Sequence, residues 1–150
     1  MKALTTLLVV GMFLTTVAVA DDVDDVKAAM QRSQVAANSG DAGTQILLEG
    51  LTTFGPTGGL LERFDSLEEA RKDRQAAFDA GLKFNLQDRH IEVRVYGNST
   101  AVATSYRVGT IALPNGNTVR PNNRITTVLV KQGGQWKIAH VHFSPLRGPQ

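Results

Sequence analysis

The hydrophobic pattern of this 150-residue chain changes its period near residue 82. Before that point, apolar residues recur at every third or fourth position in two segments, which is typical of helices with one buried face. After it, apolar and polar residues alternate in segments that are separated by turns rich in Gly, Asn and Pro, which is typical of antiparallel strands. We therefore predict an α+β fold, in which N-terminal helices pack on one face of a curved, four-stranded antiparallel meander.

The first part of the pattern predicts helices at 22–38 and 66–81. Gly40 follows the first segment and is suited to the left-handed conformation that ends many helices. Ser66 and Glu69 form a capping box at the start of the second segment. Between these helices we expect a shorter helix from Asp41 to about Gly50, and then a small hairpin or an ordered loop at 51–64.

The second part predicts four strands joined by three tight turns. The first strand is long and has a bulge near Asp88, and Pro121 indicates an edge or a bulge in the third strand. The turns are at 97–98, 114–117 and 132–134, and the second of them contains the Asn-Gly pair that favours hairpins. The expected strands cover residues 82–96, 100–113, 118–131 and 135–144.

The N-terminus has the pattern of a secretory signal peptide. After Met1 and Lys2, eighteen residues carry no charge and end in Ala18-Val19-Ala20, a small-x-small cleavage signal. A membrane anchor is the alternative, but the segment is short for a span of about 20 residues and contains several Thr and Gly. We expect residues 1–20 to be removed, a single domain at 21–146, a loose tail at 147–150, and a secreted or periplasmic protein that has no membrane segment after cleavage.

Charge is distributed unevenly along the chain. Residues 21–92 contain fourteen acidic and eight basic residues, whereas 93–150 contain seven basic residues and no Asp or Glu. This asymmetry indicates an anion-binding surface or pocket, unless the two halves neutralise each other within one fold. Nucleic acid is excluded as a partner, because the basic residues are dispersed over strands and the whole chain has only nine aromatic residues.

The last two predicted strands resemble a known family signature. The segment "RITTVLVKQGGQWKIAHVHFS" and the helix junction "NSGD" at 38–41 are similar to sequences of the nuclear transport factor 2-like superfamily. The similarity is strongest to its SnoaL-like branch and to the calcium/calmodulin-dependent kinase association domain, and it spans about residues 22–146. The residues of the strand segment that carry it are Arg124, Val128, Gly133, Gly134, Trp136, Ile138, His140, His142 and Ser144.

The resemblance implies a cone, in which a curved sheet wraps a long helix and leaves a pocket at the open end. Members commonly dimerise through the sheet, so we expect a homodimer. They include isomerases, cyclases, epoxide hydrolases, binding modules and assembly domains. The fold alone therefore does not decide the function.

The two histidines of the last strand are the candidate catalytic residues. His140 and His142 are two residues apart, which predicts that they share one strand face with Trp136, Ile138 and Ser144. Imidazole is a natural acid–base group, but both side chains could instead bind a ligand or have a structural role. The last three strands contain no carboxylate, so any other base would be His90 or an acid from the helices or the first long strand.

Two arginines are the candidate ligand-binding residues. Arg107 and Arg124 lie in the middle of strands in apolar or β-branched surroundings, where a guanidinium needs a partner or a solvated cavity. A small acidic ligand would satisfy both, and so would an internal ion pair with an acid from the helices. Tyr106 and Trp136 complete the predicted ligand-binding set.

We predict neither a metal site nor a cofactor. His-x-His supplies two ligands where a stable site needs three or four, and the chain has one further histidine and no cysteine. The leading prediction is an exported domain that binds a small molecule in the cone, an anionic one if the arginines bind it. The alternatives are an isomerase, cyclase or hydrolase with a histidine base, and a homo-oligomerisation module.

Overall fold

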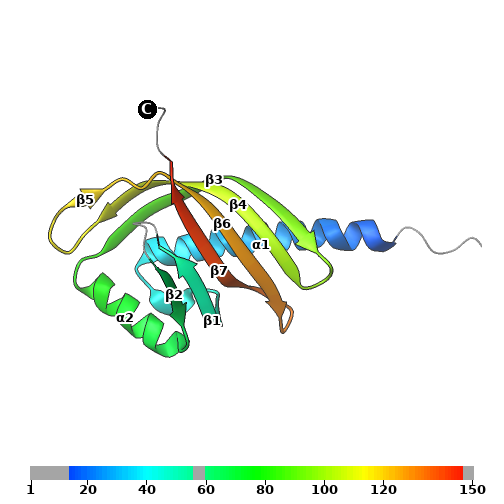
Figure 1. The fold of residues 1–150 in the computed structure, drawn as a ribbon, viewed down its shortest axis with the longest axis horizontal. Helices are drawn as coiled ribbons and strands as arrows, with labels where there is room; N and C mark the ends of the chain where they lie inside the picture. Colours follow the sequence, from blue (N-terminus) through cyan, green and yellow to red (C-terminus); the bar gives the residue numbers. More distant parts are fainter. Residues whose placement is uncertain (1–13, 56–59, 147–150) are drawn as a thin grey trace, which may run out of the picture.

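The computed structural model describes residues 14–55 and 60–146. Residues 1–13, which belong to the predicted signal peptide, and the predicted loose tail at 147–150 lie outside the described residues. No helix in the described part is both long and apolar enough to cross a membrane. The elements, in chain order, are α1 (Leu14–Ser39), the 3-10 turn η1 (Ala42–Thr44), β1 (Leu47–Phe54), β2 (Leu61–Phe64), α2 (Leu67–Asp79), β3 (Lys83–Tyr96), β4 (Thr100–Ala112), β5 (Thr118–Val119), β6 (Asn123–Gln132) and β7 (Gln135–Pro145) (Figure 1).

The α+β architecture and the meander are confirmed. Strands β3, β4, β6 and β7 pair antiparallel with their neighbours, in the order in which the chain makes them. The predicted third strand is interrupted at Pro121, so that it forms β5 and β6, and β5 pairs with β4. A proline has no N–H for a strand ladder, which explains the interruption.

The sheet is larger than the predicted four strands. Its order is β2-β1-β7-β6-β4-β3, with β5 beside β4. Strand β1 lies parallel to β7 and pairs antiparallel with β2. Of the hairpin and the ordered loop expected at 51–64, the structure therefore has the hairpin. Because β1 covers the free side of β7, the last strand of the meander is not an exposed sheet edge.

The predicted helix from Asp41 to Gly50 is wrong. Asp41 caps only a short 3-10 turn, with its carboxylate accepting a hydrogen bond from the N–H of Gly43 at 2.8 Å. The chain then enters β1, where Leu47 pairs with Ile138 of β7. The consecutive apolar residues Ile46, Leu47 and Leu48 are compatible with a helix or a strand. The segment forms a strand because it pairs with the side of β7 that β6 leaves free. Helix α1 also begins at Leu14, earlier than the predicted residue 22.

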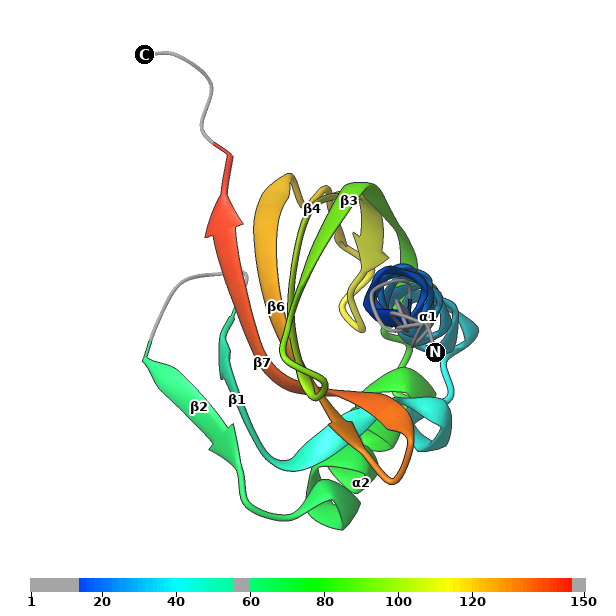
Figure 2. The ribbon, with the colours of Figure 1, turned by 90° about the vertical axis from the view of Figure 1, so that its right-hand side faces the viewer.

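Helix α1 packs on one face of the curved sheet, which we call the inner face (Figure 2). Val26, Ala29 and Met30 of the helix lie in one buried cluster with Leu129 and Ile138 of the sheet. Apolar burial of this kind is the main stabilising contribution to a single domain. The opposite side of the sheet is called the outer face below.

Bulges in two strands reverse which residues face inward. In β3, Arg89 pairs with Tyr106 and Glu92 pairs with Thr104, so three steps along β3 match two along β4. His90 lies in this bulge with a φ of 53°. Before the bulge Leu86 and Asp88 face the inner side, and after it the odd-numbered Ile91, Val93 and Val95 do. A single extra residue is enough for this change, because strand side chains alternate with period two.

The bulge in β7 corrects the predicted face of the histidines. Leu129 pairs with Ile138 and Val128 pairs with His140, so Ala139 is an extra residue. Ile138 lies in the core before the bulge, and Val141 and Phe143 line the inner pocket after it. The prediction that the histidines share a face with Trp136 and Ile138 is therefore wrong: His140, His142 and Ser144 lie on the outer face.

Candidate functional site: a pocket between the sheet and the helices

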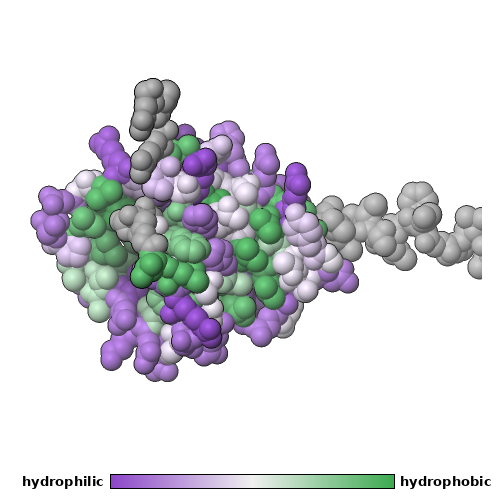
Figure 3. Space-filling view, in the orientation of Figure 1, coloured by the Kyte–Doolittle hydropathy of each residue, from purple (hydrophilic) through white to green (hydrophobic). Residues whose placement is uncertain are grey.

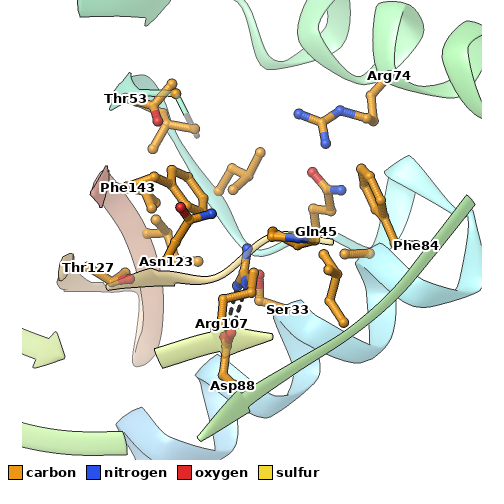
Figure 4. Close-up of a pocket in the computed structure, with 18 of the residues that line it drawn as sticks. Ser33, Gln45, Thr53, Arg74, Phe84, Asp88, Arg107, Asn123, Thr127 and Phe143 are labelled. Carbon is orange, nitrogen blue, oxygen red and sulfur yellow. Dashed lines mark hydrogen bonds and ion pairs between the residues drawn. The ribbon is translucent and has the colours of Figure 1, made fainter. Parts of the chain in front are cut away.

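A pocket of about 250 Å³ lies between the inner face of the sheet and the helices (Figure 4). Helix α1 and strand β1 form part of its wall, and α2 contributes one side chain at its margin. Much of the lining is apolar. Ten of these side chains are Met30, Leu47, Leu51, Phe64, Phe84, Leu86, Ile111, Ile138, Val141 and Phe143. Such a cavity favours a ligand with a substantial hydrocarbon body.

A bidentate ion pair forms one wall of the pocket. Asp88 of β3 and Arg107 of β4 are cross-strand partners. Arg107 donates from Nε to Oδ1 at 2.7 Å and from Nη2 to Oδ2 at 2.8 Å. The Asp88 side chain is 1% exposed and that of Arg107 is 21% exposed. Both carboxylate oxygens are engaged, and the guanidinium remains partly open to the cavity.

The surroundings of the ion pair hold it in place. The backbone N–H of Asp88 donates to Oε1 of Gln34 in α1 at 2.6 Å. On the other side, the Arg107 guanidinium carbon lies 5.4 Å from the ring centre of Phe143, which is within cation–π range. Arg107 thus has an internal ion pair, which was one of the two alternatives for the arginines, but its acid belongs to the first long strand and not to a helix.

Asn123 continues the polar row across the sheet. It is the cross-strand partner of Arg107 on β6, it lines the pocket, and it is 4% exposed. Among residues 14–55 and 60–146, its side-chain amide has no hydrogen-bond partner. Because Asn123 lines the cavity, its amide can donate to or accept from a ligand there.

Arg74 of α2 approaches the pocket from the side opposite the ion pair (Figure 4). Its guanidinium carbon is 5.9 Å from the ring centre of Phe84, and Gln45 and Glu62 line the same part of the cavity. Burial lowers the pKa of Arg74 from its ordinary value, while the charge of Glu62 acts in the opposite direction. Arginine stays protonated in either case, so a partly desolvated cation lies beside the pocket.

The two candidate catalytic histidines lie outside this pocket. On the outer face, His140 Nδ1 and Thr52 Oγ1 of β1 are hydrogen-bonded at 2.8 Å. The ring of Phe54 is 6.0 Å from that of His140 and 5.3 Å from that of His142. These contacts join β1 to β7, so a histidine base would have to act on the outer face.

The predicted ligand-binding residues are divided between three places. Arg107 lines the pocket, whereas Arg124 and Tyr106 line a separate hollow on the outer face together with His90 and Glu92. Arg124 donates to the hydroxyl of Ser144 at 3.1 Å. Trp136 lies in the buried core at 3% exposure. The structure thus brings together Tyr106 and Arg124, but neither of them with Arg107.

Sequence reasoning missed Asp88, Asn123 and Arg74 as pocket residues. A charged residue in a strand, like Asp88 in β3, is a detectable signal, but its partner depends on the bulge. Asn123 follows Pro121 closely and reads as part of a turn. Arg74 lies in a helix rich in charged residues, where nothing in the sequence distinguishes it from its neighbours. Within the described part of the chain, no group of three His, Cys, Asp or Glu side chains could hold a metal ion.

Comparison with known proteins identifies the family. The model of the SnoaL-like domain matches residues 26–148. This chain belongs to the SnoaL-like domain family. No curated protein sequence matches this SnoaL-like chain significantly.

Solved structures share the fold of this SnoaL-like domain at low sequence identity. An uncharacterized protein with a cystatin-like fold from Caulobacter vibrioides is 19% identical with a TM-score of 0.67, covering 85% of this chain and 91% of that one. A ketosteroid isomerase-like protein from Erwinia carotovora atroseptica is 20% identical with a TM-score of 0.69, covering 85% and 98%. The association domain of C. elegans CaMKII is 21% identical with a TM-score of 0.65, again covering 85% and 98%. The nuclear transport factor 2-like, or cystatin-like, fold is therefore confirmed.

Proposed function

We propose that this SnoaL-like domain binds a small, largely apolar molecule in the inner pocket. The observation that carries the proposal is the combination of an apolar cavity of about 250 Å³ with a row of polar side chains, Asp88, Arg107 and Asn123, along one wall. A mostly apolar site with a few converging polar groups is typical of specific small-molecule binding.

The polar row supports binding more than proton abstraction. Asp88 is the carboxylate of the row, and both of its oxygens accept hydrogen bonds from Arg107. A general base needs an oxygen within reach of the substrate proton, whereas the Asp88 side chain is 1% exposed and each of its oxygens is bonded to Arg107. His140 and His142 lie on the other side of the sheet, so neither reaches a molecule in this pocket. A histidine-dependent isomerase, cyclase or hydrolase is therefore the weaker candidate.

Filling the pocket tests this proposal directly. Val141→Trp places an indole in the cavity, and His142→Trp adds the same group one residue further along β7 on the outer face. We expect the neutral dye phenylnaphthylamine to bind the wild type and His142→Trp with enhanced fluorescence, and to bind Val141→Trp at least about tenfold more weakly, the equivalent of about 1.4 kcal/mol. Circular dichroism checks that both variants are folded. Equal dye binding by all three proteins would contradict the proposal.

We also propose that residues 1–20 direct export to a secreted or periplasmic location and are then removed. The uncharged segment that ends in Ala18-Val19-Ala20 supports this. Intact mass measurement of the protein recovered from a secreting host should give a chain that begins at Asp21. A chain that retains Met1 to Ala20 in the membrane fraction would contradict export with cleavage.

The outer face supports a further proposal, namely a homodimer formed through the sheet. Phe54, Leu61 and Tyr106 are exposed by 38%, 53% and 43%. Figure 3, in which β6 and β7 lie toward the viewer, shows apolar areas between hydrophilic ones. Sedimentation velocity should give a dimer for the wild type and a monomer for Phe54→Glu, with Val35→Glu on α1 as the control. A monomeric wild type would contradict it.

A further inference from the structure

The two polar ends of the inner pocket differ in how their charges are paired. At one end, the positive charge of Arg107 is balanced by the bidentate carboxylate of Asp88, and Asn123 adds a neutral amide. At the other end, Arg74 has no ion-pair partner within 4.0 Å in the described part of the chain. We propose that the ligand is an apolar keto acid, with a neutral carbonyl oxygen bound by Arg107 and Asn123 and a carboxylate beside Arg74. This inference rests on the proposed binding function of the pocket.

The Arg107 end of the pocket is suited to a neutral oxygen acceptor. Arginine has five N–H groups, and Asp88 accepts from two of them, so three remain. The NH₂ group of Asn123 supplies further donors on the adjacent strand. A carbonyl oxygen accepts two hydrogen bonds without bringing in a charge.

A ligand carboxylate fits the Arg107 end of the pocket less well. It would be buried close to the carboxylate of Asp88, which is 1% exposed. Like charges at such a site disfavour ionisation of both groups, and Arg107 already neutralises one of them. Because Asp88 neutralises its charge, Arg107 is suited to donate hydrogen bonds to a neutral group. The residue type alone would instead indicate an anion-binding arginine.

The Arg74 end of the pocket is suited to an anion. The guanidinium of Arg74 lies against the ring of Phe84, and burial there weakens its hydration. A hydrogen-bonded carboxylate compensates a partly desolvated guanidinium. Glu62 lowers the local positive potential but forms no ion pair with Arg74.

Much of the remaining pocket lining is hydrocarbon. It includes Phe84 and Leu86 of β3, Met30 of α1 and Val141 of β7. The body of the ligand should therefore be aromatic or branched aliphatic, since this surface offers mainly dispersion contacts.

Four test compounds separate the contributions of the two ends. Benzoylpropionate has the ketone and the acid, phenylbutyrate has the acid alone, methyl benzoylpropionate has the ketone alone, and methyl phenylbutyrate has neither feature intact. Affinities are measured by displacement of phenylnaphthylamine from the wild type, Asn123→Ala, Arg74→Gln and Arg124→Gln. Arg124→Gln is the matched control, because it removes the same charge from the outer face.

We expect the wild type to bind benzoylpropionate most tightly. Its preference for ketone over methylene should be about tenfold, as expected for hydrogen bonds that a methylene leaves unmade. Its preference for acid over ester should be about two- to fivefold and should shrink in high salt, since Arg74 is partly solvated. Asn123→Ala should lose most of the ketone preference alone, Arg74→Gln should lose the acid preference alone, and Arg124→Gln should retain both.

Four outcomes overturn the inference without overturning the binding function. All four compounds could displace the dye equally, or Asn123→Ala could keep the ketone preference, or Arg74→Gln could keep the acid preference. In each case the pocket binds apolar molecules but does not recognise a keto acid through these residues. If phenylbutyrate binds more tightly than benzoylpropionate, the Arg107 end of the pocket selects an anion and not a ketone. Failure of the binding function is a separate result, in which the dye binds wild type and Val141→Trp equally.

Discussion

The two faces of the sheet use similar residues for different purposes. Each face has a strand arginine, and Arg107 and Arg124 lie on the neighbouring strands β4 and β6. Arg107 is paired with a buried carboxylate in an apolar pocket, whereas Arg124 is exposed and bonded to a serine hydroxyl. The difference shows that residue type alone does not make a binding group. Its strand face and its cross-strand partner decide whether the charge is desolvated, compensated or simply hydrated.

Inserting one alanine between His140 and Val141 should have the largest effect, because it adds a residue to β7 beyond the bulge at Ala139. With the inserted residue, Val141 and Phe143 would turn outward and His142 inward, or the pairing with β6 would have to shift. We expect a loss of at least about 3 kcal/mol in the free energy of unfolding, or a chain that does not fold. Urea denaturation followed by tryptophan fluorescence measures it.

Ala139→Gly is the control for this insertion. It keeps the number of residues in β7 unchanged, and should cost about 1 kcal/mol or less. If the insertion variant were as stable as Ala139→Gly, the alternation of β7 would not determine which residues face the pocket.

Removing one acid from each face should give the next largest contrast. Asp88→Asn leaves the Arg107 charge without its partner and should lower the free energy of unfolding by about 3 kcal/mol. Glu92→Gln, on the exposed outer face, should change it by less than about 0.5 kcal/mol. The double variant Asp88→Asn/Arg107→Gln should recover part of the loss. Equal urea midpoints for the two single variants would mean that the ion pair contributes no more than a surface charge.

Truncating two adjacent residues of β7 sharpens the comparison at a smaller scale. Val141→Ala removes two methyl groups that line the pocket and contact the core, and should cost about 1–2 kcal/mol. His142→Ala removes an exposed imidazole and should cost less than about 0.5 kcal/mol. Thermal unfolding at pH 7 measures both. If His142→Ala lowers the melting temperature more than Val141→Ala does, the outer-face contacts of β7 stabilise the fold more than its inner-face contacts.

The smallest effect concerns a second ion pair, that of Lys131 with Asp22. Lys131 Nζ donates to Asp22 Oδ1 at 2.6 Å, and the two side chains are 29% and 16% exposed. The hydrogen bond to Asp22 raises the pKa of Lys131 above its ordinary value of 10.5. A raised pKa stabilises the fold below the ordinary value, and the contribution is lost as pH rises through the folded-state value.

Lys131→Gln should therefore lower the melting temperature slightly between pH 7 and about pH 9. The difference from the wild type should shrink above the ordinary lysine pKa of 10.5. Lys137→Gln is the control, because Lys137 bonds to the neutral Gln132. If the Lys131→Gln difference grows as pH rises, the assigned cause of its pKa shift is wrong.

Much of the fold could be predicted from local patterns. The capping box at Ser66 is such a pattern, and Ser66 does accept a hydrogen bond from the N–H of Glu69. The strands after residue 82 were placed to within a few residues, since their turns and alternation are local properties. The segment after Asp41 was predicted wrongly, because its apolar residues fit two elements and a distant strand, β7, selected one of them.

The candidate site was less accessible to prediction. Counting back from the turn at Gly97 pairs Asp88 with Val108, and one bulged residue changes that partner to Arg107. An internal ion pair was one of two alternatives for Arg107, and the acid expected from the helices was wrong, because Asp88 belongs to β3. Tyr106 and Arg124 were grouped with Arg107 by type, although the alternation of β4 already places Tyr106 and Arg107 on opposite faces.

The sequence by itself determined the order and type of most elements, the family signature, and the stock of arginines, histidines and carboxylates. These depend on residues within one helical turn or one hairpin. The tertiary structure decided which side chains share the pocket. A strand alternates with period two, so one extra residue in β3 and one in β7 exchange the two faces. Where a bulge occurs depends on pairing with a neighbouring strand and on covering the core, and neither is encoded in the local pattern.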